Sequence, residues 1–230
     1  MLILRNLLFY AAFYLGSPVY VLLAAAHHAL GRRDAFRHTV EAWSRFHRDC
    51  AQYLLGITRV VEGEIPAGPV LIAVKHQSFY EAIDAPGFFA RPAVFAKAEL
   101  IKIPVWGKIG QLYGLVGVQR DQGASALRKM LSSARAFSAA GRPLVLFPEG
   151  TRVPAGKRHE LQAGFAGLYK LLGLPVVPIA VNTGPLYHRR WKRGGTVTYR
   201  IGETIPPGLP REEIEARVQD AINALNGPAS

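Results

Sequence analysis

The sequence predicts an α/β fold in which a largely parallel sheet is flanked by helices and preceded by an apolar helical segment. Beyond residue 56, short runs of Val, Ile and Leu alternate with helical stretches, as in parallel sheets buried on both faces. Before residue 56, a long uncharged run indicates a helix of membrane-like composition. The 230 residues, 50% of them hydrophobic, suffice for one sizeable core and exclude a disordered chain.

The N-terminal run from Asn6 to Ala26 contains no charged residue. Twenty helical residues span about 30 Å, close to the thickness of the bilayer core. Gly16 and Pro18 interrupt the run, so one helix and two short helices joined by a break are both open. We expect the segment to insert into a membrane or to lie deep in its interface, as a span or within one leaflet. A buried helix of a soluble core is the alternative.

Basic residues dominate the charge balance, with 28 Lys and Arg against 16 Asp and Glu and a net charge of +12. This surplus favours an anionic partner, which can be nucleic acid, an anionic membrane surface or a phosphorylated substrate. Arginines follow the apolar run, at positions 32, 33, 37, 45 and 48. The positive-inside rule therefore predicts that the bulk of the chain lies on the cytoplasmic face, at the inner membrane if the protein is bacterial.

An amphipathic helix is predicted from Asp34 to Leu55, and Gly56 is a typical stop signal. Its apolar positions recur at helical spacing, while arginines occupy the other face. It can lie on a membrane or form a surface helix of the domain, and both interpretations are open. The predicted organisation is a membrane-associated helical segment over residues 1–56 and an α/β domain over residues 57–230.

Seven apolar runs are predicted as strands, and helical stretches separate most of them or follow the last. The strand runs are TRVVEGEI, GPVLIAV, PAVFAK, YGLVGVQ, RPLVLFP, LPVVPIAVN and GTVTYRI. The helices are expected over Gln122–Ala140, Gln162–Leu172 and Arg211–Leu225. In open α/β sheets, ligands bind beyond the carboxyl ends of the strands. Polar groups that each contain a cation follow four of these runs, at residues 75–78, 97–99, 119–121 and 148–152.

The stretch HQSFYE, directly after one strand run, places His76 five residues before Glu81. On one regular helix these side chains would lie about 140° apart and would not meet. They can meet if His76 lies in a strand-to-helix turn and Glu81 in the first helical turn. A carboxylate beside a histidine fixes its tautomer and supports the imidazolium, as a general base requires. Asp84 is a rival partner one turn further on, and a purely structural histidine is the simpler alternative.

The stretch LVLFPEGTR ends a strand and turns the chain. Gly150 lets the backbone approach a ligand closely, Thr151 adds a hydroxyl donor, and Arg152 can hold a phosphate through two hydrogen bonds. Arg120, in GVQRD, also follows a strand run. The simpler alternatives are an ordinary turn with a solvated arginine and a surface arginine paired with Asp121.

Together, the blocks KHQSFYEAID, GVQRD, LFPEGTR and VVPIAVN, in this order and spacing, resemble those of the 1-acyl-glycerol-3-phosphate acyltransferase family. The segment KAELIKIPVWGKIGQLYG between the first two blocks is also similar, and the resemblance covers residues 70–184. It implies a glycerolipid acyltransferase-like fold. It further implies transfer of a fatty acyl group from acyl-CoA or acyl-carrier protein to the sn-2 hydroxyl of lysophosphatidic acid. The implied product is phosphatidic acid for phospholipid biosynthesis, formed without a metal or prosthetic group.

The resemblance also implies a role for each residue of the site. His76 is the expected general base, and Glu81 is the carboxylate that orients it. The expected substrate-binding residues are Lys75, Arg120, Glu149, Gly150, Thr151 and Arg152, with Arg120 on the acceptor phosphate. The family's usual carboxylate is aspartate. The longer glutamate therefore requires a slightly more distant backbone or a role shared with Asp84.

Particular sequence features disfavour two rival functions. A nucleic-acid binder would explain the charge but not the apolar N-terminus, and the sequence has no nucleic-acid-binding motif. A hydrolase is disfavoured because no G-x-S-x-G motif occurs and Cys50, the only cysteine, lies in a predicted helix away from the strand ends. Two alternatives stay open: acylation of another lyso-lipid, such as one that contains an amino acid, and a catalytically silent lipid-binding relative.

The stretch YHRRWKRGG, from Tyr187 to Gly195, combines basic and aromatic residues. It can be a solvated loop. It can also be a patch that seats the protein on anionic lipid, to which each cation near the surface contributes about 1 kcal/mol. The cations concerned are Arg189, Arg190, Lys192 and Arg193.

Overall fold

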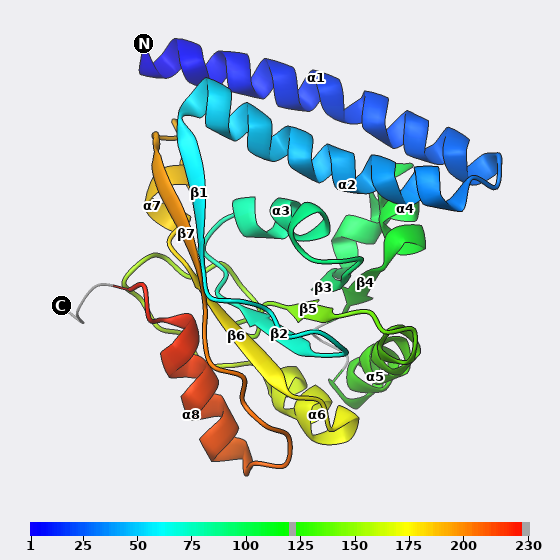
Figure 1. The fold of residues 1–230 in the computed structure, drawn as a ribbon, viewed down its shortest axis with the longest axis vertical. Helices are drawn as coiled ribbons and strands as arrows, with labels where there is room; N and C mark the ends of the chain where they lie inside the picture. The colour runs from blue at the N-terminus through cyan, green and yellow to red at the C-terminus, as the bar shows by residue number, and fades with distance from the viewer. Residues whose placement is uncertain (120–122, 227–230) are drawn as a thin grey trace.

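A seven-stranded sheet in the order β1-β7-β6-β2-β5-β3-β4 forms the centre of the computed structural model, which describes residues 1–119 and 123–226 (Figure 1). All seven predicted strands are confirmed. Their bounds are β1 Ile57–Glu62, β2 Leu71–Val74, β3 Ala93–Lys97, β4 Leu115–Val118, β5 Leu144–Leu146, β6 Val176–Val181 and β7 Gly195–Ile201. The strands from β6 to β4 run parallel to one another, whereas β7 and β1 run parallel to each other and antiparallel to β6.

Helices cover both faces of the sheet. The three predicted helices are confirmed with slightly different ends, as α5 Gly123–Ala139, α6 Ala163–Leu172 and α8 Arg211–Ile222. The structure adds α3 Tyr80–Phe88, the 3₁₀ turn η2 Ala98–Lys102, α4 Trp106–Tyr113 and the short α7 Gly184–Tyr187. Buried side chains of α5, α6 and α8 form one core cluster with the sheet, and α3 packs in a second cluster on the other face.

The N-terminal run is one continuous helix, α1 Leu2–Ala29, so the two-helix alternative is wrong. Gly16 and Pro18 lie inside the helix, and contacts with α2 stabilise the helix around both residues. A Cβ atom on Gly16 would lie 2.6 Å from the Phe46 ring, so only glycine lets α2 approach this closely. Near Pro18, Ser17 Oγ donates to the Phe13 carbonyl at 2.7 Å, and the Trp43 indole donates to the same Oγ at 2.9 Å.

The second helix, α2 Arg33–Cys50, turns back along α1 and continues as the π-helical turn η1 Ala51–Leu55 (Figure 1). The predicted stop at Gly56 is confirmed, and this residue adopts a left-handed φ of 73°. The helix lies between α1 and α3, where Ser44 Oγ donates to the Ile83 carbonyl at 2.7 Å. Its apolar face is therefore covered by protein, which favours a helix of the domain over a helix lying on a membrane.

One face of α1 belongs to the protein core. Phe9 and Phe13 are buried in the same cluster as Val74 and Val145 of the sheet. Most of α1 is not buried: only 17% of its most apolar stretch lies inside the protein, which argues against a buried core helix. The predicted division at residue 56 remains a prediction, since the α1–α2 hairpin and the sheet share this core cluster.

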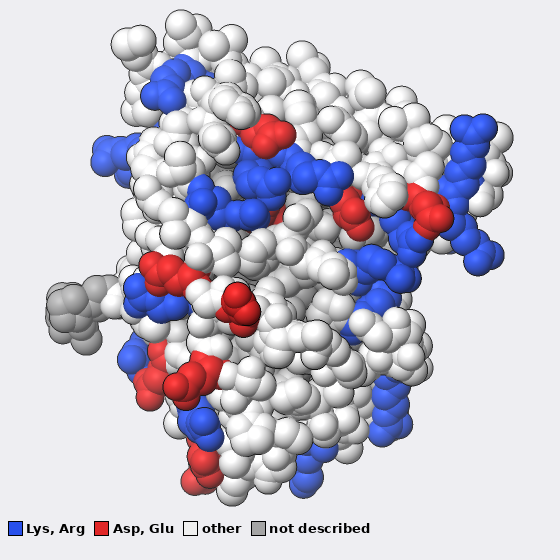
Figure 2. All heavy atoms as spheres, in the orientation of Figure 1, with Lys and Arg blue, Asp and Glu red and all other residues white. Residues whose placement is uncertain are grey.

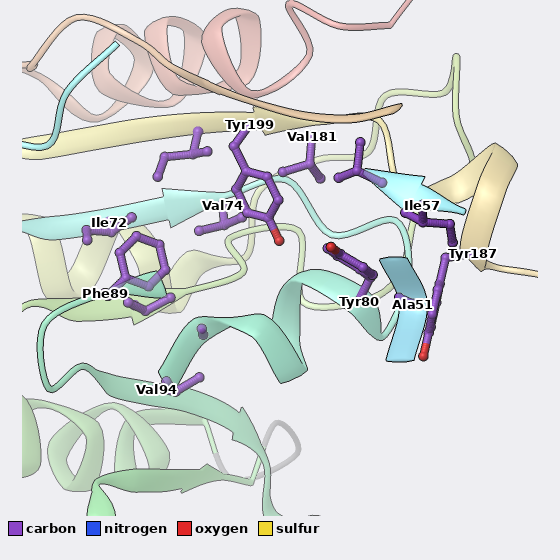
Figure 3. Close-up of a cluster of buried hydrophobic side chains, with 14 of the residues drawn as sticks. Ala51, Ile57, Ile72, Val74, Tyr80, Phe89, Val94, Val181, Tyr187 and Tyr199 are labelled. Atoms are coloured by element: carbon purple, nitrogen blue, oxygen red, sulfur yellow. The ribbon is translucent and has the colours of Figure 1, made fainter. Parts of the chain in front are cut away.

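The core between the sheet and α3 contains two large buried tyrosines. Tyr80 from α3 and Tyr199 from β7 point their hydroxyl ends toward one another, with Val74 of β2 beside Tyr199 (Figure 3). Burial raises the pKa of both tyrosines, with the carboxylate of Asp84 adding to the shift. These side chains hold α3, and with it the turn that precedes it, against the end of β2.

His47 links α2 to the α7 segment inside this core. It is fully buried, its Nε2 lies 2.7 Å from the Tyr187 hydroxyl, and burial, aided by the charges of Lys192 and Arg48, lowers its pKa to about 3. The unfolded chain binds a proton here near pH 6.5 while the folded chain does not, so acid favours unfolding. This stabilising contribution is fully present above pH 6.5 and is lost as the pH falls toward 3.

We expect the free energy of unfolding to decrease between pH 7 and pH 5.5 by about 1 kcal/mol through this residue. Denaturant titrations at the two pH values measure the decrease. His47→Gln keeps a donor near Tyr187 but does not titrate, so its decrease should be smaller. Equal decreases in the wild type and the variant would contradict a buried neutral His47.

Candidate active site

The polar segments after β2, β5 and β6 meet at one edge of the sheet. The three strands are neighbours, with Ala73 of β2 in register with Leu146 of β5 and with Pro178 of β6. The backbone N–H of Val153 donates to the His76 carbonyl at 2.7 Å, which joins the segment after β5 to the segment after β2. Parallel strands thus bring together residues that are far apart in the sequence, at the edge where such sheets bind ligands.

His76 and Glu81 form a hydrogen-bonded pair, as their spacing predicts. The Nδ1 atom of His76 lies 3.0 Å from Oε1 of Glu81. His76 lies in the turn after β2, and Glu81 lies in the first turn of α3. The glutamate reaches the imidazole with its extra methylene, so the structure accommodates the departure from aspartate without a second carboxylate.

Glu81 is almost completely buried and has four further hydrogen-bond donors around its carboxylate. Oε1 accepts the N–H groups of Gln77 and Ser78, both at 2.6 Å. Oε2 accepts the hydroxyls of Ser78 at 2.8 Å and Thr183 at 2.7 Å. Burial raises the pKa of Glu81, but the hydrogen bond and charge of His76, helped by Ser78 and Thr183, outweigh it and hold the pKa below its usual value.

This arrangement gives the two imidazole nitrogens different roles. A carboxylate next to Nδ1 favours a proton on that atom, which leaves Nε2 unprotonated in the neutral ring. The ring lies against Phe147, with the centroids 4.4 Å apart, and 16% of the side chain is exposed. His76 is therefore fixed in orientation but accessible at the surface, as proton abstraction from a substrate requires.

Asp84, the rival carboxylate, is engaged elsewhere. Its Oδ2 lies 2.6 Å from Arg59 and its Oδ1 lies 3.4 Å from Arg48, and its side chain is fully buried. Burial raises its pKa, although both arginines oppose the shift. Asp84 thus ties α3 to β1 and α2, and the expectation that it shares the role of Glu81 is not supported by this geometry.

Lys75 and Glu149 form a fully buried ion pair beneath the site. Lys75 Nζ lies 2.5 Å from Glu149 Oε1 and also donates to the Lys157 carbonyl and to Asn223 Oδ1. Glu149 Oε2 accepts the N–H of His76 at 3.2 Å. Burial raises the pKa of Glu149, opposed chiefly by Lys75. Because neither side chain reaches the surface, this arrangement favours positioning of the His76 turn over the direct substrate contact predicted for both residues.

The rest of the FPEGTR segment presents its polar groups outward. Gly150 is buried with a φ of 70°, and a Cβ atom there would lie 2.6 Å from the Gln162 side chain. Thr151 and Arg152 are exposed, and the Arg152 guanidinium lies 4.2 Å from the centroid of the Phe79 ring. This leaves Thr151 and Arg152 accessible for an anionic ligand. Arg120 lies outside the residues that the structure describes.

The basic and aromatic stretch from Tyr187 to Gly195 divides into two parts. Lys192 is buried rather than lipid-facing: its Nζ lies 4.3 Å from the Tyr187 ring centroid and 5.0 Å from that of Tyr10, and burial lowers its pKa to about 8. It therefore ties α1 to the β6–β7 connection. Arg189, Arg190 and Arg193 are exposed.

Sequence reasoning missed the residues that complete the network. Thr183 is fully buried and bonds to Glu81 from two residues beyond β6. Gln77 Oε1 accepts the Gly184 N–H at 2.9 Å and so connects the same two segments. Asn223 reaches Lys75 from beyond α8. The sequence signals were the position of Thr183 just after a predicted strand and that of Gln77 in the polar group at residues 75–78.

Comparison with known proteins shows the family of the chain. Residues 58–182, which span His76, Glu81 and the FPEGTR segment, match the acyltransferase family. The chain belongs to the acyltransferase family. A 1-acyl-sn-glycerol-3-phosphate acyltransferase from Pseudomonas aeruginosa is 32% identical to this acyltransferase over 198 residues, which cover 84% of the chain and 74% of the relative.

The whole fold is shared with a solved acyltransferase. The crystal structure of the 1-acyl-sn-glycerophosphate (LPA) acyltransferase from Thermotoga maritima superposes with a TM-score of 0.76 at 28% identity, covering 97% of this chain and 95% of that one. A lyso-ornithine lipid O-acyltransferase from Pseudomonas aeruginosa is 27% identical over 74% of this chain and 73% of its own. The predicted fold class and family are confirmed.

Proposed function

We propose that this acyltransferase moves a fatty acyl group from a thioester to the sn-2 hydroxyl of 1-acyl-glycerol-3-phosphate, and so forms phosphatidic acid. The observation that carries the proposal is the His76–Glu81 pair, at 3.0 Å, beside the exposed Thr151 and Arg152 of the FPEGTR segment. The whole-chain likeness to an LPA acyltransferase supports the same acceptor.

The chemical step follows from the two nitrogens of His76. Nε2 takes the proton of the acceptor hydroxyl while that oxygen attacks the thioester carbonyl carbon. The tetrahedral intermediate collapses as the C–S bond breaks, and the leaving sulfur takes the proton from the imidazolium. The buried carboxylate of Glu81 stabilises the imidazolium between these proton transfers, and its depressed pKa keeps it ionised. The products are the new ester and a free thiol.

The cations near His76 account for binding of the acceptor phosphate. Arg152 can donate two hydrogen bonds to a phosphate, and Thr151 adds a hydroxyl. Arg152 lies close to the pair, since its guanidinium is 4.2 Å from the centroid of the Phe79 ring, which comes between His76 and Glu81 in the sequence. We propose Arg120 as a further phosphate ligand because it follows β4 in the sequence. Lys75 and Glu149 hold the turn on which the base is placed.

A cavity beside this edge suits an anionic acyl donor. It has a volume of about 400 Å³ and is lined by His188, Arg189 and Arg193, among other residues of the β6–β7 connection. Acyl-CoA and acyl-carrier protein are both anionic, so both donors stay in the proposal. No cofactor beyond the acyl donor is part of it.

The outer face of α1 supports a position on one leaflet of a membrane, and the arginines that follow the apolar run favour the cytoplasmic side for the α/β domain. Leu4, Leu8, Leu15, Val19 and Leu22 are exposed, and the outer surface of α1 is nearly free of charged atoms along its length (Figure 2). The opposite face is fixed to α2 and the core, so α1 cannot cross a bilayer without leaving both. In this position the lysophospholipid acceptor reaches the site from the same leaflet.

The lyso-ornithine lipid relative favours a second candidate acceptor, a lyso-lipid that contains an amino acid. Purified protein would be incubated with an acyl-CoA and a panel of lyso-lipids, and products would be identified by mass spectrometry. We expect phosphatidic acid from lysophosphatidic acid as the main product, because the exposed cations near His76 match a phosphate. If lyso-ornithine lipid were the one acceptor acylated, acyl transfer would remain the proposed reaction and lyso-ornithine lipid would be its acceptor. If the protein bound lyso-lipids but formed no product with either acyl-CoA or acyl-carrier protein as donor, it would be a catalytically silent lipid-binding relative.

A further inference from the structure

A basic cavity lies at the opposite edge of the sheet from His76. It has a volume of about 540 Å³ and lies between the turn that joins α1 to α2 and the segments that lead into the strands. Arg91, Tyr113 and Arg142 line it, and they precede β3, β4 and β5 in the chain. Because these strands are parallel, their amino ends lie away from the catalytic edge. The cavity is therefore separate from the site that holds His76.

The cavity lining is strongly cationic. Four arginines face a single carboxylate, that of Asp34, which pairs with Arg37. Among the described residues, the side chains of Arg33 and Arg91 make neither a hydrogen bond nor an ion pair. Burial lowers the pKa of Arg142, and the nearby Arg91 and Arg37 lower it further although Tyr113 opposes them. Cations crowded in this way favour an anionic ligand.

The first turn of α2 adds to this positive potential. The helix begins at Arg33, and its N-cap residue Arg32 provides no side-chain hydrogen bond to the first turn. The amino end of a helix carries a partial positive charge and presents N–H groups that suit an anion. Arg33, Asp34 and Arg37 of this turn all line the cavity.

An apolar surface continues from the cavity mouth. Leu30 lies next to the lining residue Gly31 and is 66% exposed, and Leu22 and Leu23 lie on exposed parts of α1. Lys and Arg atoms gather below the turn between α1 and α2, next to the uncharged outer surface of α1 (Figure 2). An anionic group with an attached apolar chain would contact both the cationic cavity and the apolar surface beside it. A small soluble anion would contact the cavity alone.

We propose that the cavity binds the phosphate of an anionic phospholipid whose acyl chains lie against the exposed face of α1. Near the catalytic edge, α1 is held by Asn6, which bonds to the backbone of Lys192 at 2.7 and 2.9 Å. A bound lipid would hold the other end of the helix at the same depth in the leaflet. The protein would then be fixed in tilt, with the catalytic edge at the membrane surface.

The test compares two matched double variants of the full-length protein. Arg33→Gln with Arg91→Gln removes the cavity cations that lack hydrogen-bond partners among the described residues. Arg211→Gln with Arg217→Gln removes two exposed cations from α8, which lies far from the hairpin turn (Figure 1). Binding would be measured to phosphatidylcholine vesicles with and without phosphatidylglycerol, which has no free hydroxyl on its acylated glycerol. Thermal unfolding would show that both variants remain folded.

The wild type should prefer vesicles that contain phosphatidylglycerol, and the cavity variant should lose roughly 30-fold in binding to them. The α8 variant should lose little. Equal losses in the two variants would overturn the proposal in favour of diffuse surface charge, as would the absence of any preference in the wild type. If inorganic phosphate bound the cavity as tightly as short-chain phosphatidylglycerol, the ligand would be a free anion and the lipid proposal would be overturned. These readouts need no turnover, so they are independent of the proposed acyl transfer.

Discussion

Replacing His76 by alanine is expected to lower kcat by about 10²–10⁴, with a much smaller change in KM for the acceptor. The reason is that the substitution removes the group proposed to take the hydroxyl proton, while Thr151 and Arg152, the proposed phosphate ligands, are unchanged. Formation of phosphatidic acid, followed by mass spectrometry at several acceptor concentrations, separates the two parameters. His159→Ala is the matched control, because His159 is an exposed histidine that bonds to its neighbour's carbonyl.

A second substitution tests the pair rather than the residue. Glu81→Gln keeps the size of the side chain but loses the charge that supports the imidazolium, so kcat should again fall by orders of magnitude while acceptor binding persists. If both His76→Ala and Glu81→Gln kept the wild-type kcat, the pair would be structural and the proton would be removed elsewhere.

Replacing Lys75 by methionine is expected to cost about 3–5 kcal/mol in the free energy of unfolding. The substitution leaves Glu149 charged or forced to protonate in a fully buried site, and it removes the cation at 2.5 Å from Oε1. The same loss should displace the turn that carries His76, because Glu149 also accepts its backbone N–H. Denaturant titration at neutral pH measures the stability.

Two control variants test whether burial of the Lys75–Glu149 pair causes this loss of stability. Lys75→Met combined with Glu149→Leu removes both charges and should recover much of the lost stability, because no unpaired charge remains. Arg158→Gln breaks the exposed Arg158–Asp220 pair and should cost less than about 1 kcal/mol. A Lys75→Met variant as stable as the wild type would show that the pair is not essential to the fold.

The sheet could be predicted because its signal is local. Each strand is an apolar run with turn residues at its ends, and the fully buried strands, β2, β5 and β6, are apolar along their whole length. The continuity of α1 could not be predicted in the same way. Gly16 and Pro18 weaken an isolated helix, and what preserves it is contact with Phe46 and Trp43, which follow after a reversal of the chain.

The contact between His76 and Glu81 was predictable for a related reason. His76 and Glu81 are close in sequence, and a strand followed by a helix defines the turn that brings them together. The partners of Asp84 and Lys75 were not predictable, because Arg59, Arg48 and Glu149 come from distant segments. Thr183 lies 102 positions from Glu81 and meets it only because β6 and β2 are neighbours. Local spacing thus indicated the chemistry, while the supporting contacts depend on the tertiary fold.

The measurement that tests the central claim most directly is the release of free thiol from acyl-CoA by purified protein, with and without lysophosphatidic acid. We expect thiol release only when the acceptor is present, with one phosphatidic acid formed for each thiol. Thiol release at the same rate without acceptor would show a thioester hydrolase and would contradict acyl transfer by the His76–Glu81 pair.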